Sequence, residues 1–599
     1  MLTRLPQEVF DMIAGMLPYK TDLKALSLVS RDVYTAVAPT LWRSLSIRVD
    51  DAQLAEGCIT SCIDLKPPCV GNGDSFIRHV HRLTFESEHR RLFYGLIAKC
   101  PHKMMDENDR NTFLHAYADN HMWFGGTVGE IIEDIPPDQL SEFVWNLGIC
   151  LPDNLLSSKG LLAIEQPLIR SLRLHTSTEP ECDNGIDLEQ ASSHWEAADN
   201  NDISPWPFRR LKQLAWIGPK SSDILTGTLA SAIQHNSEHL EELELDLVKY
   251  YPLVWRPPPS ETTKERIKQF FAAKVFFLGD AMAAGQPPLK ALEFLSLSHF
   301  PLAAHLASKL VDISQLRSLI LRSCLGWVEF LTAMTSSGLP IRLKVLEVVS
   351  QGFVDGRARE VLTNFINAFE GLEELYIWWP IGQIVSTNDW DGIASGHRAT
   401  LKRLIHCDCG ACISVVKNGF GMECIGTRRL TKVFTDELSK APRAKQTLKF
   451  LHTRYKYIWN GEHLGESPSW LRPDLERSSE SVAYSLTDEE DASRRTWLAQ
   501  PPASWLAEWA FGPDGLPSLE AVALGPTSHP ENDPHYTDKK VEEENIILCR
   551  SVPGARVGQS NFNVPRRGGR LWTKIVDEYG TFMRACPHNN NPLVTKEGI

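Results

Sequence analysis

Residues 343–348 read Leu-Lys-Val-Leu-Glu-Val, residues 372–377 read Leu-Glu-Glu-Leu-Tyr-Ile, and residues 401–406 read Leu-Lys-Arg-Leu-Ile-His. The three stretches share the pattern L-x-x-L-x-L, whose end alternates like a half-buried β-strand. Copies also begin at residues 211, 240, 292 and 316, so most successive copies start 24 to 29 residues apart. The interval of 52 residues between 240 and 292 contains either a degenerate copy or an insertion.

Weaker copies lie nearer both ends of the chain, at Val80-Leu83-Phe85, Ile169-Leu172-Leu174 and Leu519-Val522-Leu524. Helix-like stretches separate the strands, at residues 224–235, 265–284, 302–311, 327–334 and 359–369. A strand and a helix that recur at this period are typical of leucine-rich repeats. Because one unit cannot bury its apolar face alone, we predict an α/β fold in which irregular repeats stack into a solenoid. The alternative is an α/β protein whose leucine-rich strands follow no solenoid order.

Alternation along each strand predicts which side chains a partner would meet. Counting the first leucine as position 1, positions 4 and 6 point into the core, whereas positions 3, 5 and 7 face the concave side. Solenoids commonly bind partners on that side. The candidate target-binding residues are Glu242, Glu244, Arg322, Tyr376, Trp378 and Arg403. The alternative is that helices or loops cover this face, or that Trp378 belongs to the core.

The first forty-odd residues predict three short helices. Pro6 suits a first helical turn, and Ser30 suits the N-cap of the third helix. Such a unit is too small for a comfortable core and usually docks on something else. It is therefore either a cap on the rest of the chain or a binding module for another protein.

In order and spacing, residues 3–46 resemble the F-box motif, and the whole chain resembles fungal F-box proteins with degenerate leucine-rich repeats. The resemblance rests on Leu5-Pro6-x-Glu8-Val9, Ile13, Leu17, Asp22-Leu23, Leu26, Leu28-Val29-Ser30-Arg31, Tyr34 and Pro39-x-Leu41-Trp42. It implies binding to the Skp-type adaptor of an SCF ubiquitin ligase and, through the adaptor, to a cullin scaffold. The residues that it assigns to the motif's core or its adaptor face are Leu5, Pro6, Ile13, Leu17, Leu23, Leu26 and Val29.

The resemblance and the repeat pattern divide the chain into four parts. An F-box is expected at residues 1–46, and an irregular linking region with early repeats and an acidic loop (179–204) at residues 47–207. The repeat solenoid follows at residues 208–425. Residues 426–599 are expected to form an irregular C-terminal region with a late repeat near 516–525 and a flexible tail.

Composition excludes several classes of protein. Of the 599 residues, 43% are hydrophobic and 23% are charged, which is the balance of a folded globular chain and not of a disordered one. The net charge of −13 disfavours nucleic-acid binding. No apolar run is long enough to span a membrane. The 13 cysteines, with no secretory signal, favour free thiols in a reducing compartment, either cytoplasm or nucleus.

The sequence shows no catalytic motif, and we expect no enzymatic activity and no cofactor. The spacing of one histidine and three cysteines resembles that of a zinc site, at His406, Cys407, Cys409 and Cys412. However, His406 and Cys407 fall in a strand, where alternation places neighbouring side chains on opposite faces and so separates the ligands. Buried free thiols are the favoured alternative, and no metal is predicted. The sequence therefore favours a non-catalytic substrate receptor of a ubiquitin ligase. Two alternatives stay open: a repeat scaffold with no ligase role, and an enzyme that carries a helical cap.

Overall fold

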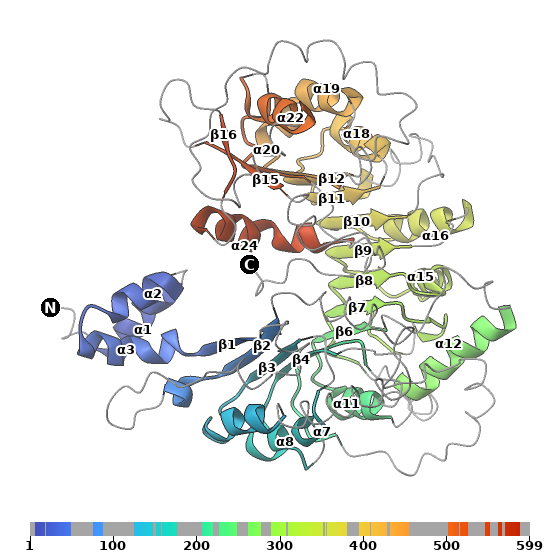
Figure 1. Cartoon of the computed structure of the whole chain (residues 1–599). Helices are drawn as coiled ribbons and strands as arrows, with labels where there is room; N and C mark the ends of the chain where they lie inside the picture. Colours follow the sequence, from blue (N-terminus) through green and yellow to red (C-terminus); the bar gives the residue numbers. More distant parts are fainter. Residues whose placement is uncertain are drawn as a thin grey trace, which may run out of the picture. The chain divides into compact units, whose positions relative to one another are not determined.

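The structure is a computed structural model. It describes residues 6–17, 20–49, 76–87, 125–147, 151–156, 159–176, 206–219, 227–247, 261–276, 289–306, 310–350, 354, 356–379, 395–407, 409–427, 430, 432–454, 501–513, 515–524, 546–551, 561–565 and 569–586. The chain divides into two compact units (Figure 1). The first comprises Met1–Leu316 and Cys324–Ala333, and the second comprises Arg317–Ser323 and Met334–Ile599.

The three N-terminal helices are α1 (Gln7–Met16), α2 (Lys20–Ser27) and α3 (Arg31–Leu41). They enclose a small apolar core of Phe10, Ala14, Leu23, Val33 and Val37. As predicted, Ser30 caps α3, because its hydroxyl accepts a hydrogen bond from the backbone N–H of Val33 at 3.2 Å.

Seven parallel strands of the first unit follow one another in chain order. They are β1 (Ser44–Val49), β2 (Arg82–Ser87), β3 (Glu142–Asn146), β4 (Ser171–His175), β5 (Gln213–Ile217), β6 (Glu242–Asp246) and β7 (Phe294–Ser298). The short helices of this unit are η3 (Phe76–His79), α7 (Asp153–Leu156), α8 (Leu161–Glu165), α11 (Thr228–Asn236) and α12 (Glu261–Phe276). Because β6 pairs directly with β7, the interval of 52 residues is an insertion, and it contains α12.

In the second unit, seven more parallel strands again follow chain order. They are β8 (Ser318–Arg322), β9 (Val345–Val349), β10 (Glu374–Trp378), β11 (Arg403–His406), β12 (Cys424–Thr427), β13 (Phe450–Thr453) and β14 (Ala521–Leu524). Two antiparallel strands, β15 (Ile546–Arg550) and β16 (Phe562–Asn563), end the sheet. The helices of this unit are α16 (Gly356–Asn367), η7 (Ser395–His397), α18 (Cys409–Lys417), α19 (Lys432–Lys440), α20 (Pro442–Thr447), α22 (Pro501–Phe511) and α24 (Arg570–Arg584), and α15 (Trp327–Ser336) crosses the boundary between the units.

The predicted α/β class is confirmed, and the chain-order parallel strands are compatible with the predicted solenoid. The apolar residues at positions 1, 4 and 6 of the copies that begin at residues 211 to 401 are buried. The strands extend beyond the predicted 208–425 range in both directions. Sequence analysis missed four copies, which are Trp42-Leu45-Ile47, Leu140-Phe143-Trp145, Met422-Ile425-Thr427 and Leu448-Leu451-Thr453. Aromatic, methionine and threonine residues replace leucine there, which hides the pattern.

Buried polar side chains link neighbouring repeats through hydrogen bonds to the backbone. The side-chain carbonyl of Gln166 accepts a hydrogen bond from the N–H of Leu140 at 2.9 Å, and that of Asn236 accepts one from Leu211 at 2.8 Å. His397 does the same through Nδ1, which accepts from the N–H of Leu372 at 3.2 Å. Each acceptor lies 25 or 26 residues after its donor, so it reaches back one repeat and satisfies a buried N–H that no strand pairs.

His397 accepts this hydrogen bond only when its ring is neutral, so we predict that the stability of the fold depends on pH. Its Nε2–H donates to the carbonyl of Ile366 at 3.0 Å while Nδ1 accepts, and burial lowers its pKa below the ordinary 6.5. Below pH 6.5 the unfolded chain therefore binds more protons at this residue, so its contribution to stability is lost as the pH falls from 6.5 toward the lowered folded pKa. His397→Asn removes the titrating group. Below pH 6.5, the thermal unfolding temperature of the variant is expected to depend less on pH than that of the wild type. Equal pH dependence of the two unfolding temperatures would contradict a role of His397 in stability.

Two predicted segments lie outside the described residues. These are the acidic loop at 179–204 and the C-terminal tail after residue 586.

Candidate functional site

The concave-side positions of the second unit are covered by the C-terminal helix α24. Figure 1 shows α24 on the side of the sheet opposite α16. Its buried side chains, at a spacing of three and four residues, form one cluster with position 3, 5 and 7 residues of the strands. The cluster on the helix consists of Ile575, Val576, Tyr579, Phe582 and Met583. This spacing is the sequence signal that could have revealed the helix in a region expected to be irregular.

Aromatic contacts fix α24 on the strands. Tyr579 stacks on Phe450 of β13 with ring centroids 4.4 Å apart, and Phe582 meets the same ring edge-on at 5.8 Å. Phe582 also contacts Tyr376 of β10 edge-on at 5.9 Å. Gly426 leaves room for this approach, because a Cβ there would lie 3.3 Å from Phe582 and 2.7 Å from Ile405.

Two of the predicted target-binding residues are therefore not available on this surface. Tyr376 and Trp378 are only 2% and 6% exposed, because they belong to the core beneath α24. Burial, followed by the neighbouring Glu374, raises the pKa of Tyr376. The prediction that these two aromatic residues form an exposed anchor is wrong, and the alternative of a covered face holds for this unit.

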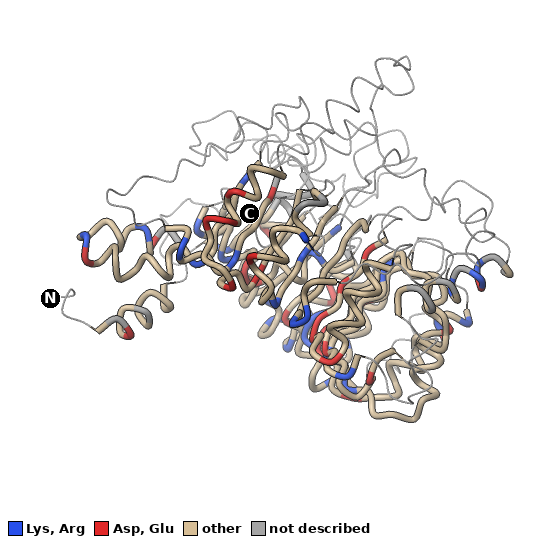
Figure 2. Tube along the Cα trace, turned by 90° about the horizontal axis from the view of Figure 1, so that it is seen from below, with Lys and Arg blue, Asp and Glu red and all other residues tan. Residues whose placement is uncertain are grey.

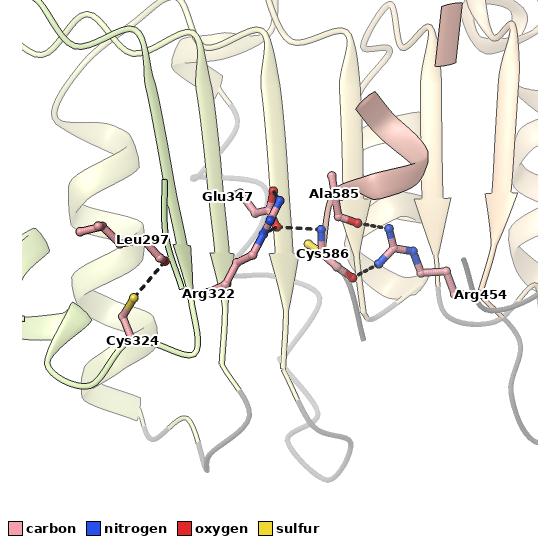
Figure 3. A network of polar contacts seen from close by, with 7 residues as sticks. All are labelled: Leu297, Arg322, Cys324, Glu347, Arg454, Ala585 and Cys586. Atoms are coloured by element: carbon pink, nitrogen blue, oxygen red, sulfur yellow. Dashed lines mark hydrogen bonds and ion pairs between the residues drawn. The ribbon is translucent and has the colours of Figure 1, made fainter. Parts of the chain in front are cut away.

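A network of charged groups holds the end of α24 (Figure 3). The carboxylate of Glu347 accepts hydrogen bonds from Nε and Nη2 of Arg322, at 2.6 and 3.0 Å, and from the backbone N–H of Cys586 at 2.8 Å. The buried guanidinium of Arg454 donates to the carbonyls of Ala585 and Cys586 and lies over the Trp378 ring. These carbonyls would otherwise lack partners at the helix C-terminus, where a cation is also favoured by the helix dipole.

The two arginines predicted to meet a target are engaged within the chain. Arg322 pairs with Glu347 as described, and Arg403 donates to the Glu374 carboxylate at 3.1 Å. Arg322 binds Glu347 through two nitrogens, whereas Arg403 uses Nη1 alone and its side chain is 28% exposed. Both arginines lie in ion pairs within the chain, and their role in target binding stays a prediction.

The corresponding face of the first unit is polar. Glu242 and Glu244, the remaining predicted residues, lie half-buried on β6. Polar contacts cross this face, including His175 with Asn146 at 3.3 Å, Ser171 with Gln213 at 2.9 Å, and the ion pair of Arg48 with Glu86 at 3.1 Å. The two units therefore differ in character at the same repeat positions, which are mainly apolar in the second unit and mainly polar in the first. Polar residues at these positions of the first unit, such as Asn146, His175 and Ser296, are nevertheless buried.

The structure divides the predicted adaptor-binding residues into two groups. Leu23 is in the helical core, and Leu17 and Leu26 pack against it. Pro6 is exposed, Val29 is 64% exposed, and Ile13 is intermediate. Leu5 lies outside the described residues. Pro6 and Val29 are thus exposed to another protein, and the intermediate exposure of Ile13, Leu17 and Leu26 leaves part of each side chain accessible.

Sequence analysis missed three exposed apolar residues among these helices. Met12 and Met16, one turn apart on α1, are 59% and 79% exposed, and Leu28, beside Val29 after α2, is 78% exposed. The apolar residues of α1 form a stripe that is wider than the part of the helix in contact with the small core. That width is the sequence signal that could have revealed an outward-facing apolar side.

The histidine and cysteine residues near 406–412 do not converge. His406 is buried with its ring edge-on to Trp379, whereas Cys407 packs in the cluster under α24 on the opposite face of β11. Cys412 donates a weak hydrogen bond to the carbonyl of Gly426. Within the described ranges, no three His, Cys, Asp or Glu residues are grouped to hold a metal ion.

The described thiols under α24 are poor nucleophiles. Burial raises the pKa of Cys424 and of Cys549 to about 12, and it also raises the pKa of Cys586. A protonated thiol neither attacks an electrophile nor ligates a metal readily. These cysteines therefore act as small apolar side chains of the cluster.

Charge is distributed along the described chain without separation of the two signs. Basic and acidic residues are interspersed along it (Figure 2), with ion pairs between neighbouring repeats such as Lys344 with Glu373 at 2.9 Å. Of the helices that the structure describes, none has the length and apolar character of a membrane span. No protein-family model matches the chain, and no curated protein matches it significantly.

Proposed function

We propose that the chain is the substrate-recognition subunit of an SCF-type ubiquitin ligase, in which α1–α3 form an F-box that binds a Skp-type adaptor. The observation that carries the proposal is the exposed apolar surface of these helices, at Met12, Met16, Leu28 and Val29. Half of the eight large apolar side chains that are exposed in the described chain lie within this short segment. Surface of this kind is typical of a protein-binding site.

The proposed role needs no bond chemistry from this chain. The repeat units would hold a target protein while the adaptor and a cullin scaffold bring the ubiquitin-loaded partner close. Catalysis would then arise from a raised effective concentration of target lysines near the reactive thioester. The expected partners are therefore proteins, and the expected compartment is the cytoplasm or nucleus.

The test is the binding of purified chain to a purified Skp-type adaptor, measured by titration, with a Leu28→Asp/Val29→Asp variant. Each side chain is largely exposed, so the substitutions remove apolar contact without opening the helical core. If both side chains are buried by the adaptor, their loss weakens binding by at least about 100-fold, since each contributes about 1.5–3 kcal/mol.

Two further variants separate binding from folding. Ile164→Asp changes an apolar residue of α8 that is 61% exposed, so it is a matched control and should leave adaptor binding unchanged. Leu23→Ala opens the helical core, and it should lower helicity as well as binding. A folded wild-type chain that does not bind the adaptor would refute the ligase role.

A repeat scaffold with no ligase role is the second candidate. The polar face of the first unit favours it equally, since that surface does not depend on an adaptor. Failure of adaptor binding together with retained binding of a protein to this face would select the scaffold.

A further inference from the structure

The two signs of charge are mixed along the chain as a whole, but three exposed arginines gather where β4 and β5 begin. Arg170 is position 2 of the copy that begins at residue 169, and Arg209 and Arg210 directly precede the copy that begins at residue 211. Lys212, at position 2 of the latter copy, adds a fourth exposed cation. We call these four residues the basic patch. The three guanidiniums make no hydrogen bond or ion pair in the described part of the chain, whereas Lys212 pairs with Glu241 at 2.5 Å.

Buried hydrogen bonds fix the backbone beneath the patch. The side chain of Asn236, which is 1% exposed, donates to the carbonyl of Phe208 at 2.8 Å and accepts from the N–H of Leu211 at 2.8 Å. Both of these anchor residues are fully buried, so Arg209 and Arg210 form the short loop between them, with exposed side chains. A loop that is already held in place loses little conformational freedom when it binds a ligand.

Backbone pairing places Arg170 beside this loop. Its carbonyl accepts hydrogen bonds from the N–H of Lys212 at 2.8 Å and from that of Gln213 at 3.1 Å, so the two backbones lie one strand spacing, about 4.8 Å, apart. Along the chain, Arg209 comes three residues before Lys212, which is a span of at most about 10 Å. In an extended segment, alternate side chains lie about 7 Å apart on one face. The patch therefore matches two or three side chains at alternate residues of such a segment.

Neighbouring repeats leave the charge of the patch largely uncompensated. In the second unit, residues at position 2 of adjacent repeats form ion pairs, such as Lys344 with Glu373 at 2.9 Å. Arg170 and Lys212 occupy the same position of adjacent repeats, but both are cations. Glu241 of the next repeat pairs with Lys212 and with none of the three arginines. A cluster of uncompensated cations raises the local concentration of anionic groups.

We propose that the basic patch binds a short acidic segment of the recruited protein, through carboxylates at alternate residues. The inference rests on the proposed function in one respect, since it names a surface that meets the recruited protein. A guanidinium binds the two oxygens of a carboxylate through paired N–H donors, and the exposed arginines of the patch have these donors available.

The charges beside the patch favour a short segment over a long polyanion. Glu241 and Glu293 occupy position 2 of the next two repeats, and the N–H of Glu293 donates to the carbonyl of Glu241 at 2.9 Å. Together with the net charge of −13, these carboxylates repel a nucleic acid or an anionic membrane that extends past β5. The preferred segment is therefore acidic over β4 and β5 and neutral or basic over β6 and β7.

The test titrates purified full-length chain into a fluorescent peptide that carries three glutamates at alternate residues between serine and glycine, and measures anisotropy. At about 0.1 M salt, wild type is expected to bind this peptide at least about 10-fold more tightly than the same peptide with glutamine in place of glutamate. At about 1 M salt, where the screening length falls to about 3 Å, the preference should disappear. Arg209→Glu/Arg210→Glu should weaken binding by about 10-fold or more, because it replaces two attractions with two repulsions.

Arg357→Glu/Lys574→Glu is the matched control, because it makes the same change in net charge at two exposed residues of the second unit. It should leave the affinity for the acidic peptide unchanged. Equal weakening by the two double variants, or no preference of wild type for glutamate over glutamine, would overturn the proposal. Tighter binding of a single-stranded oligonucleotide through the same arginines would also overturn it. Adaptor titration of all variants should match that of wild type, so failure here is distinct from failure of the ligase role.

Discussion

Phe582→Ala is expected to release α24 from the strands of the second unit, at a cost of about 3–5 kcal/mol. The ring is fully buried and contacts Phe450 and Tyr376 edge-on, so its removal leaves a cavity that rigid strands cannot fill. Gly426 adds to the cavity, because it contributes no side chain of its own at that point.

Hydrogen exchange is the suitable measurement, because a chain of two units need not unfold in one step. Amides of residues 570–584 in the variant should exchange about 100-fold faster or more, at the lower end of that cost. Leu571→Ala on the same helix is the matched control, since Leu571 is 40% exposed and its loss should change little. Unchanged protection in Phe582→Ala would show that α24 is held by other contacts.

Glu347→Ala is expected to destabilise the same helix end by about 3–5 kcal/mol, the range for removing one partner of a buried charge pair. The carboxylate is 1% exposed and accepts from both Arg322 and the N–H of Cys586. Without it, the Arg322 guanidinium, whose side chain is 18% exposed, loses its counter-ion, and a buried backbone donor loses its acceptor.

A double-mutant cycle distinguishes the charge pair from the backbone hydrogen bond. Removing both charges in Arg322→Met/Glu347→Met should cost much less than Glu347→Ala alone, because apolar replacement of a buried pair is often nearly neutral. Glu347→Gln keeps an acceptor for Cys586 and should be intermediate. Exchange rates of the last turn of α24 provide the readout. Additive effects of the two single substitutions would contradict a direct coupling between Arg322 and Glu347.

The repeat pattern was readable because it is local. Leu343, Leu346 and Val348 specify a strand with a defined buried edge, and their recurrence specifies the order of stacking. Of the missed strands, β3, β12 and β13 lie where the buried positions hold other residue types, since a core position constrains size and apolarity more than identity. His397, Asn236 and Gln166 share a structural role that three different residue types fill, so no motif marks it.

The candidate sites depended more on long-range contacts. Trp378 and Tyr376 read equally well as binding anchors or as core residues, because alternation gives the face of a strand and not what covers that face. The covering helix begins almost two hundred residues later in the chain. Leu26 and Val29 also look alike in the sequence, three residues apart. In the structure Leu26 packs on the helical core, whereas Val29 is exposed.

The sequence by itself determined the α/β class, the parallel strands with their inward and outward positions, and the three helices at the N-terminus. Each follows from periodicities of two or of 3.6 residues, which are properties of the backbone within one element. Only the tertiary structure decided that α24 covers strands of the second unit and that Arg322 and Arg403 each pair with a glutamate of the chain. Burial and ion pairing depend on which distant segments of the chain contact each other, so no single segment determines them.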